Sequence, residues 1–180
     1  MMDSINNLKN TRTYLVGAMD RVKDGGLTWR SKITPRLNEI GIKVIDPCKK
    51  NIHNISEEDA RYWIEHYKDL GQYDKIRDEF GIIRSADLRC VDISDFIIAH
   101  IDLSVHACGT YEEIVTANRQ KKPVLIWCEQ GKKYTPNWLF FMLPHEHIFG
   151  SMDELLNYLN HINEIEKTSL LERWLFFSNL

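Results

Sequence analysis

The 180-residue sequence has only four cysteines, no long apolar run and no strong excess of one charge. The cysteines lie far apart and form no Cys-x-x-Cys pair, so the pattern indicates neither a zinc knuckle nor a redox motif. They are Cys48, Cys90, Cys108 and Cys128. Reduced thiols are the default for such a chain, and we expect a cytoplasmic protein.

Charge and hydropathy argue against two classes of partner. The 23 Lys and Arg residues nearly balance the 26 Asp and Glu residues, which is not typical of a nucleic-acid-binding surface. No apolar run approaches the roughly 18 residues of a membrane span, and the N-terminal segment lacks the apolar core of a signal peptide. We therefore expect small-molecule partners, with no nucleic acid and no membrane.

Metal or cofactor motifs are also missing. His145-Glu-His147 beside Pro144 is too small a ligand set for a metal and is more typical of a turn. Asp24-Gly-Gly26 lacks the lysine and the spacing of a phosphate-binding P-loop. We expect no metal and no other cofactor.

Length and composition fit one domain. With 43% hydrophobic residues, the chain can bury an ordinary core. We predict a disordered arm over residues 1–10 and a single domain over residues 11–180. A polar and aromatic stretch at about residues 53–80 predicts a helical insertion, which Gly71 breaks into two pieces.

Alternating strands and helices predict the fold class. Apolar runs that end at turn residues are typical of buried parallel strands. The expected strands are residues 13–18, 42–45, 95–101, 123–128 and 146–149, and the expected helices are residues 28–40, 83–93, 109–120, 151–166 and 170–177. This order predicts an α/β protein with a doubly wound, flavodoxin-like parallel sheet of about five strands and helices on both faces. Right-handed crossovers favour the strand order 2-1-3-4-5.

That strand order also predicts where a ligand binds. In open α/β sheets the crevice lies at the carboxyl ends of the strands, where the order reverses. The loop after Ala18 and the turn at residues 107–110 are therefore expected to face each other across it.

Several short motifs follow one another around this crevice. A tyrosine and a glycine turn lie in the first strand, as Tyr14-Leu-Val-Gly-Ala-Met19, and Asp87 lies eight residues before Asp95. Further along the chain come a helix that opens with glycine, a basic pair with a proline, and an asparagine after a proline. They are Gly109-Thr-Tyr-Glu-Glu-Ile-Val-Thr-Ala117, Lys121-Lys-Pro123 and Pro136-Asn137.

In order and spacing these motifs resemble the nucleoside 2-deoxyribosyltransferase family, including its relatives that hydrolyse the N-glycosidic bond of nucleotides. The resemblance covers about residues 12–149, without the insertion. It implies a double displacement at the anomeric carbon, with Glu113 as the nucleophile. Asp87 is implied to exchange a proton with the departing and incoming bases, and Tyr14 to orient Glu113. The implied partners are a deoxynucleoside or deoxynucleotide substrate and a free nucleobase.

The resemblance further implies a set of substrate-binding residues. They are Gly17, Met19, Arg21, Arg30, Asp46, Ala107, Cys108, Gly109, Thr110 and, from a neighbouring subunit, Asn137. Because of Asn137, we expect a homodimer or a larger even-numbered assembly. Ala107 departs from the free-nucleoside transferases, which carry an aspartate there for the 5'-hydroxyl. We expect Arg21, Lys23 and Arg30 in the facing loop to hold a 5'-phosphate instead.

The residues leave alternatives open. A glutamate such as Glu113 is also what the dipole of a helix start favours, and Asp87 also fits a surface position on a helix. Water could replace the second base, which would make the enzyme a deoxynucleoside 5'-monophosphate N-glycosidase. Without the aspartate at position 107, a non-catalytic nucleotide-binding module of the same fold is also consistent with the sequence.

Overall fold

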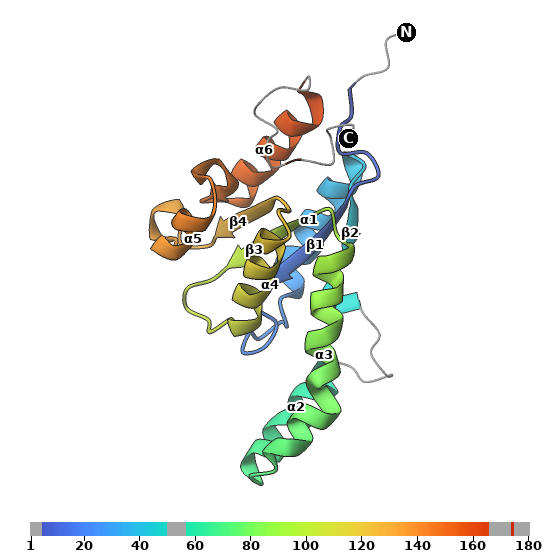
Figure 1. Ribbon diagram of the computed structural model, residues 1–180, viewed down its shortest axis with the longest axis vertical. Helices are drawn as coiled ribbons and strands as arrows, with labels where there is room; N and C mark the ends of the chain where they lie inside the picture. Colours follow the sequence, from blue (N-terminus) through green and yellow to red (C-terminus); the bar gives the residue numbers. More distant parts are fainter. Residues whose placement is uncertain (1–4, 50–56, 166–173, 175–180) are drawn as a thin grey trace.

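Five parallel strands form one sheet in the order β2-β1-β3-β4-β5 (Figure 1). The computed structural model describes residues 5–49, 57–165 and 174. The strands are β1 (Arg12–Gly17), β2 (Lys43–Ile45), β3 (Phe96–Ile101), β4 (Val124–Cys128) and β5 (Ile148–Phe149). The predicted fold class and strand order are confirmed.

Helices cover both faces of the sheet. They are α1 (Leu27–Glu39), α2 (Glu57–Asp69), α3 (Tyr73–Ile93), α4 (Cys108–Arg119), α5 (Asn137–Met142) and α6 (Met152–Glu164), with the short 3-10 helices η1 (Pro47–Lys49), η2 (Lys132–Tyr134) and η3 (His145–His147). Leu15 and Ile98 point to the face that α1 and α6 cover, and Val16 and Ile97 point to the face of α3, α4 and α5. This alternation buries the central strands on both sides, as in other parallel sheets. No helix in the described ranges has the length and apolarity needed to cross a bilayer.

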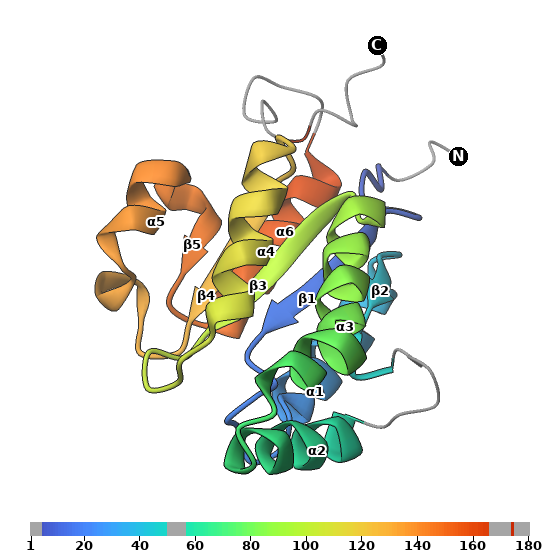
Figure 2. The ribbon, with the colours of Figure 1, turned by 60° about the horizontal axis from the view of Figure 1, so that its bottom comes forward.

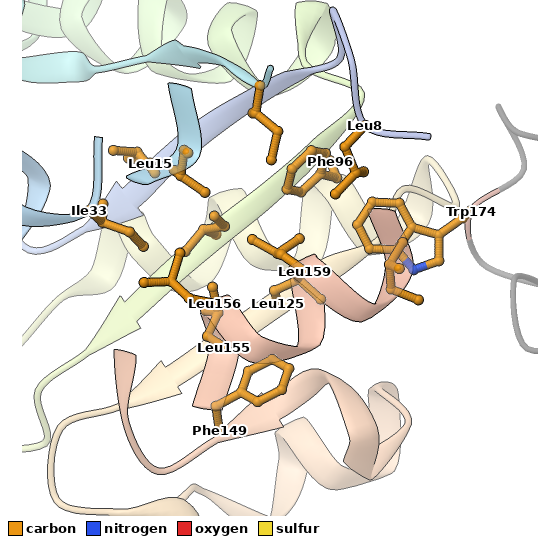
Figure 3. Close-up of a cluster of buried hydrophobic side chains, with 14 of the residues drawn as sticks. Leu8, Leu15, Ile33, Phe96, Leu125, Phe149, Leu155, Leu156, Leu159 and Trp174 are labelled. Carbon is orange, nitrogen blue, oxygen red and sulfur yellow. The ribbon is translucent and has the colours of Figure 1, made fainter. Parts of the chain in front are cut away.

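Residues near the N-terminus are anchored to α6. Leu8 is fully buried in the cluster that Figure 3 shows, and its backbone N–H donates to Asn163 Oδ1 at 2.8 Å. Asn7 Nδ2 donates to two backbone carbonyls at the end of α6. The predicted disordered arm is therefore wrong for residues 5–10, and residues 1–4 lie outside the described residues. One leucine among polar residues gives no periodic signal, so the sequence did not indicate this anchor.

Leu8→Ala is expected to lower the free energy of unfolding by about 2–5 kcal/mol, because it leaves a cavity in a fully packed cluster. Urea unfolding would measure the loss. Ile5→Ala is the matched control, since Ile5 is 43% exposed, and a change within about 0.5 kcal/mol is expected there. Equal stability of the Leu8 variant and the wild type would contradict the anchor.

The C-terminal segment contributes to the same cluster. Trp174 is the one described residue of the helix expected at residues 170–177, and the others lie outside the described ranges. Its ring packs on Phe96 with the centroids 5.1 Å apart (Figure 3), and its indole N–H donates to the Tyr158 hydroxyl. Leu8 and Trp174 therefore both pack on the face of the sheet opposite to α3 and α4.

A helical hairpin of α2 and α3 projects beyond the sheet (Figure 1). The turn contains Gly71 at φ +67°, a conformation that glycine adopts without steric cost. Beyond the turn, α3 continues without interruption to Ile93, so the helix predicted over residues 83–93 is the second half of this longer helix. Residues 53–56 of the predicted insertion lie outside the described residues. The hairpin is thus continuous with a helix that packs on the sheet.

Candidate active site

A cavity of about 580 Å³ opens at the carboxyl ends of β1 and β3. Its walls come from Tyr14, the loop after β1, helices α2 and α3, and the start of α4. Figure 2 shows α3 and α4 on the same side of the sheet, with β1 and β3 behind them. The position is the switch point that the strand order predicts, and the volume is in the usual range for small-molecule sites, about 300–1,000 Å³.

Three side chains from three different elements meet at the base of this cavity. The Tyr14 hydroxyl of β1 lies 2.7 Å from Glu113 Oε1 of α4 and 3.2 Å from Asp87 Oδ1 of α3. Tyr14 is 1% exposed and Glu113 is also buried, whereas Asp87 is half-buried. The structure therefore brings together the three residues that the resemblance implies to be catalytic.

The Tyr14 hydroxyl stays protonated in this setting. Burial raises the pKa of Tyr14 far above its ordinary value of 10.0, and the charges of Glu113 and Asp87 raise it further. A neutral hydroxyl can donate one hydrogen bond and accept others. Tyr14 is thus a fixed donor between two carboxyl groups.

The raised pKa of Tyr14 predicts a loss of stability in alkali. The hydroxyl keeps its proton to higher pH in the folded protein than in the unfolded chain. Its contribution to the free energy of unfolding is therefore complete below about pH 10. Above that pH the contribution falls by about 1.4 kcal/mol per pH unit. Relative to Tyr14→Phe, the wild type should therefore lose free energy of unfolding between pH 9 and 11. Urea unfolding at each pH measures this difference. Tyr134→Phe, at an exposed position, is the control and should follow the wild type; parallel curves for Tyr14→Phe and the wild type would contradict the prediction.

Most of the other predicted binding residues also line the cavity. From the loop after β1 and the turn before α4 they are Gly17, Met19, Ala107, Cys108, Gly109 and Thr110. Neighbouring atoms lie so close to Gly17 that they leave little room for a side chain. A Cβ there would lie 3.0 Å from the Trp29 ring and 3.2 Å from the His100 carbonyl oxygen. The two loops face each other as the strand order predicts.

Arg30 does not reach the cavity, which corrects its predicted role as a phosphate ligand. Its side chain is buried, and its guanidinium donates to the backbone carbonyls of Leu15, Gly17 and Gly26 at 2.9–3.2 Å. Asp46 also lies away from the cavity, and its carboxylate is 3.9 Å from Arg30 Nε. Arg30 thus supports the loop after β1 from within the protein.

Two other predicted residues lie away from the cavity. Arg21 is exposed, with Asp20 as its ion-pair partner at 3.8 Å. Asn137 is the first residue of α5 and does not line the cavity of its own chain. Its implied place in the site of a neighbouring subunit stays a prediction.

The hairpin contributes side chains to the cavity that were not predicted. Arg61, Arg77 and Arg84 line it together with Phe80. Arg84 donates two hydrogen bonds to the carboxylate of Glu112, and these bonds hold the pKa of Glu112 below its ordinary value. Helical spacing from Arg77 to Asp87 could have indicated a shared face, but not that this face turns toward a cavity. No three His, Cys, Asp or Glu side chains in the described part of the chain gather as a metal would require.

Known proteins resemble this chain in structure rather than in sequence. The sequence matches no family model and no curated protein. One similar structure is the 2-deoxyribosyltransferase of the psychrotolerant bacterium Bacillus psychrosaccharolyticus, with a TM-score of 0.54 and 15% identity, over 87% of this chain and 93% of that one. Another is the CMP N-glycosidase of Clostridium botulinum, with a TM-score of 0.45 and 18% identity, over 83% of this chain and 98% of that one. The first similarity shows that the chain has the α/β fold of that deoxyribosyltransferase.

Proposed function

We propose that this protein cleaves the N-glycosidic bond of 2'-deoxynucleosides or their monophosphates and transfers the deoxyribosyl group to another base. The observation that carries the proposal is the Tyr14 hydroxyl shared by Glu113 and Asp87. One hydroxyl proton cannot serve two carboxylates at once. The shorter contact, at 2.7 Å, is the one to Glu113, so Tyr14 orients Glu113 and leaves Asp87 to exchange a proton with the base. This arrangement supplies one oriented nucleophile and one group for acid and base catalysis.

In the first half of the reaction, the Glu113 carboxylate attacks C1' of the deoxyribosyl group. The bond from C1' to the base nitrogen breaks, its electron pair goes to the base, and Asp87 gives its proton to the base. Tyr14 keeps Glu113 in position for attack, which retains the advantage of proximity. The product of this step is a glycosyl ester on Glu113.

In the second half, a nitrogen of the incoming base attacks C1' and Glu113 leaves as a carboxylate. Asp87 takes the proton that the incoming base releases. Two displacements retain the configuration at C1', as in retaining glycosidases, whose two carboxyl groups are about 5 Å apart. The common contact of both carboxyl groups with one oxygen atom supports such a short separation here.

Apolar walls support transfer to a base over hydrolysis. Ile64 of α2 and Ile76, Phe80 and Ile83 of α3 form an apolar part of the cavity wall. The flat aromatic face of a nucleobase can pack on such a surface, whereas an attacking water needs polar partners. The alternative acceptor is water, and the alternative to catalysis is nucleotide binding alone.

An assay of products separates these functions. The protein is incubated with the common deoxynucleosides and their monophosphates, with and without a second free base, and the products are separated by chromatography. We expect a new deoxynucleoside only when the second base is present. Release of base at the same rate without an acceptor would identify a hydrolase, and binding without turnover would identify a non-catalytic module.

We also propose that α5 mediates assembly of a homodimer or a larger even-numbered oligomer. Trp138 is 71% exposed and Phe141 is 78% exposed, and their rings are 6.2 Å apart on a helix that Leu139 anchors to the core. Large apolar side chains that gather on a surface are typical of protein contacts. Asn137 at the start of this helix would then reach a neighbour's cavity.

Light scattering tests the assembly. The wild type is expected at twice the 21.2 kDa chain mass or more, and the double variant Trp138→Ser, Phe141→Ser at the mass of one chain with reduced activity. Tyr62→Ser on the hairpin is the control, since Tyr62 is equally exposed but far from α5 in the chain. A wild type with the mass of one chain and full activity would rule the assembly out.

A further inference from the structure

Basic side chains of the helical hairpin have no part in the bond cleavage proposed above. Arg61 of α2 and Arg77 of α3 line the cavity but touch neither Glu113 nor Asp87. We infer that these two arginines form an anion subsite that holds the 5'-phosphate of a deoxynucleotide substrate. The inference rests on the proposed function and names the substrate class that the site selects.

The carboxyl groups of the cavity have other partners than these two arginines. Of the five in its lining, Glu113 and Asp87 contact the Tyr14 hydroxyl, and the other three form the ion pairs Glu112–Arg84, Asp20–Arg21 and Glu65–Lys68. Neither Arg61 nor Arg77 has a carboxylate partner among the described residues. A phosphate monoester carries a charge of about −1.5 to −2 at pH 7, which two arginines neutralise.

Arg61 lies where the hairpin meets the loop after β1. Its Nη1 donates to the Val22 carbonyl oxygen at 3.3 Å, and a Cβ on Gly25 would lie 3.5 Å from its Nη2. One long hydrogen bond leaves most of the five guanidinium donors available to a ligand. Met19 of the same loop also lines the cavity. Positive charge therefore reaches this end of the cavity from α2, rather than from Arg30 as the sequence predicts.

Arg77 approaches the cavity from the projecting end of the hairpin. It lies two helical turns before Arg84 on the same face of α3, and about 15 Å along the helix from Asp87. It is exposed and has no hydrogen-bond partner in the described ranges, so its long side chain can turn to a ligand. Arg84 is not available in this way, because Glu112 binds it.

Phosphate is the anion that fits these groups. A guanidinium presents paired N–H donors that match two oxygens of a phosphate, and such charge-assisted bonds are among the stronger ones in proteins. Ala107 in the facing turn lines the cavity without a carboxylate that would repel the dianion. A deoxynucleotide would then place C1' near Glu113 and its phosphate toward the loop after β1 and the hairpin.

Calorimetry on the Glu113→Gln protein tests the subsite without turnover. Each of the four common deoxynucleoside 5'-monophosphates, its deoxynucleoside and inorganic phosphate are titrated at 50 and 150 mM salt. The monophosphate is expected to bind at least about tenfold more tightly than the nucleoside, a ratio that one or two hydrogen bonds to charged groups provide. Adding Arg61→Ala and Arg77→Ala should remove most of that ratio and leave the affinity for the nucleoside within about twofold. Arg89→Ala is the control, because Arg89 lies on α3 outside the cavity with Asp92 as its partner.

Several results would overturn the subsite. A nucleoside that is bound and cleaved as well as its monophosphate would remove the phosphate assignment and leave the proposed reaction intact. The same conclusion follows if the double substitution weakens the binding of nucleoside and monophosphate equally. It also follows if the preference for the monophosphate disappears at 150 mM salt, because diffuse electrostatic attraction is screened beyond about 8 Å at that salt concentration. If inorganic phosphate binds through the two arginines and the monophosphate binds no more tightly than the nucleoside, the ligand of the subsite is a free anion. Binding of neither nucleoside nor monophosphate would overturn the proposed reaction as well.

Discussion

Glu113→Gln is expected to reduce kcat by at least about a thousandfold, because an amide oxygen cannot replace the attacking carboxylate and loss of a nucleophile costs several orders of magnitude in rate. Glutamine keeps the size of the side chain and can still accept the hydrogen bond from Tyr14. Product formation from a deoxynucleoside or its monophosphate with a second base measures the effect. Unchanged binding in the variant would show that the loss lies in the chemical step.

Glu112→Gln is the matched control for this experiment. Glu112 is the preceding residue on α4, so its side chain points about 100° away from that of Glu113 and bonds to Arg84 instead. We expect this variant to keep much of its activity, since an ion pair at an exposed position contributes about 0–1 kcal/mol. Loss of activity in the Glu112 variant together with an active Glu113 variant would assign the nucleophile to the other glutamate.

Arg30→Met is expected to lower the free energy of unfolding by about 3–5 kcal/mol, as removal of one partner from a buried ion pair usually does. Methionine retains the apolar length of the side chain, so the change removes mainly the guanidinium. Without it, three backbone carbonyls lose a donor, and the nearly buried carboxylate of Asp46 keeps only the exposed Lys49 as a cationic partner. Urea unfolding followed by circular dichroism measures the loss.

Arg36→Met on the same helix is the control for Arg30. Arg36 forms an exposed ion pair with Asp153 at 2.9 Å, and a change of at most about 1 kcal/mol is expected there. The comparison also separates the two interpretations of Arg30. A stable Arg30 variant with weakened binding of the monophosphate would restore the phosphate-binding role that the burial of Arg30 argues against.

The sequence indicated those parts of the fold that depend on local periodicity. Apolar runs and glycine turns predicted every strand to within a few residues, because a buried parallel strand needs apolar side chains on both faces. The capping box at Ser151 predicted the start of α6 correctly, and the Ser151 hydroxyl accepts from the Glu154 backbone N–H. The short helix α5 was not predicted, since six residues are too few for a helical period to emerge.

For the motif residues, too, the sequence indicated some features and only the structure decided others. Tyr14, Asp87 and Glu113 were identified because the order and spacing of their motifs resemble a known family, and the structure brings them to one point because β1, α3 and α4 pack together. For Arg30 the sequence showed only a basic residue near a glycine-rich loop, which fits a phosphate ligand as well as a buried support. Its three contacts to backbone carbonyls, all formed on folding, decide between the two.

The sequence by itself determined the α/β class and the strand order, because these follow from short-range patterns and from the handedness of crossovers. The residues of the candidate catalytic group came from the resemblance of the motifs to a known family. Only the tertiary structure decided that Leu8 is a core residue, that Arg30 is buried, and that Arg61 and Arg77 face the cavity. The physical reason is that burial and charge pairing depend on segments far apart in the chain. A basic residue on a helix has the same local pattern whether its neighbour in space is water, a carbonyl group or a binding cavity.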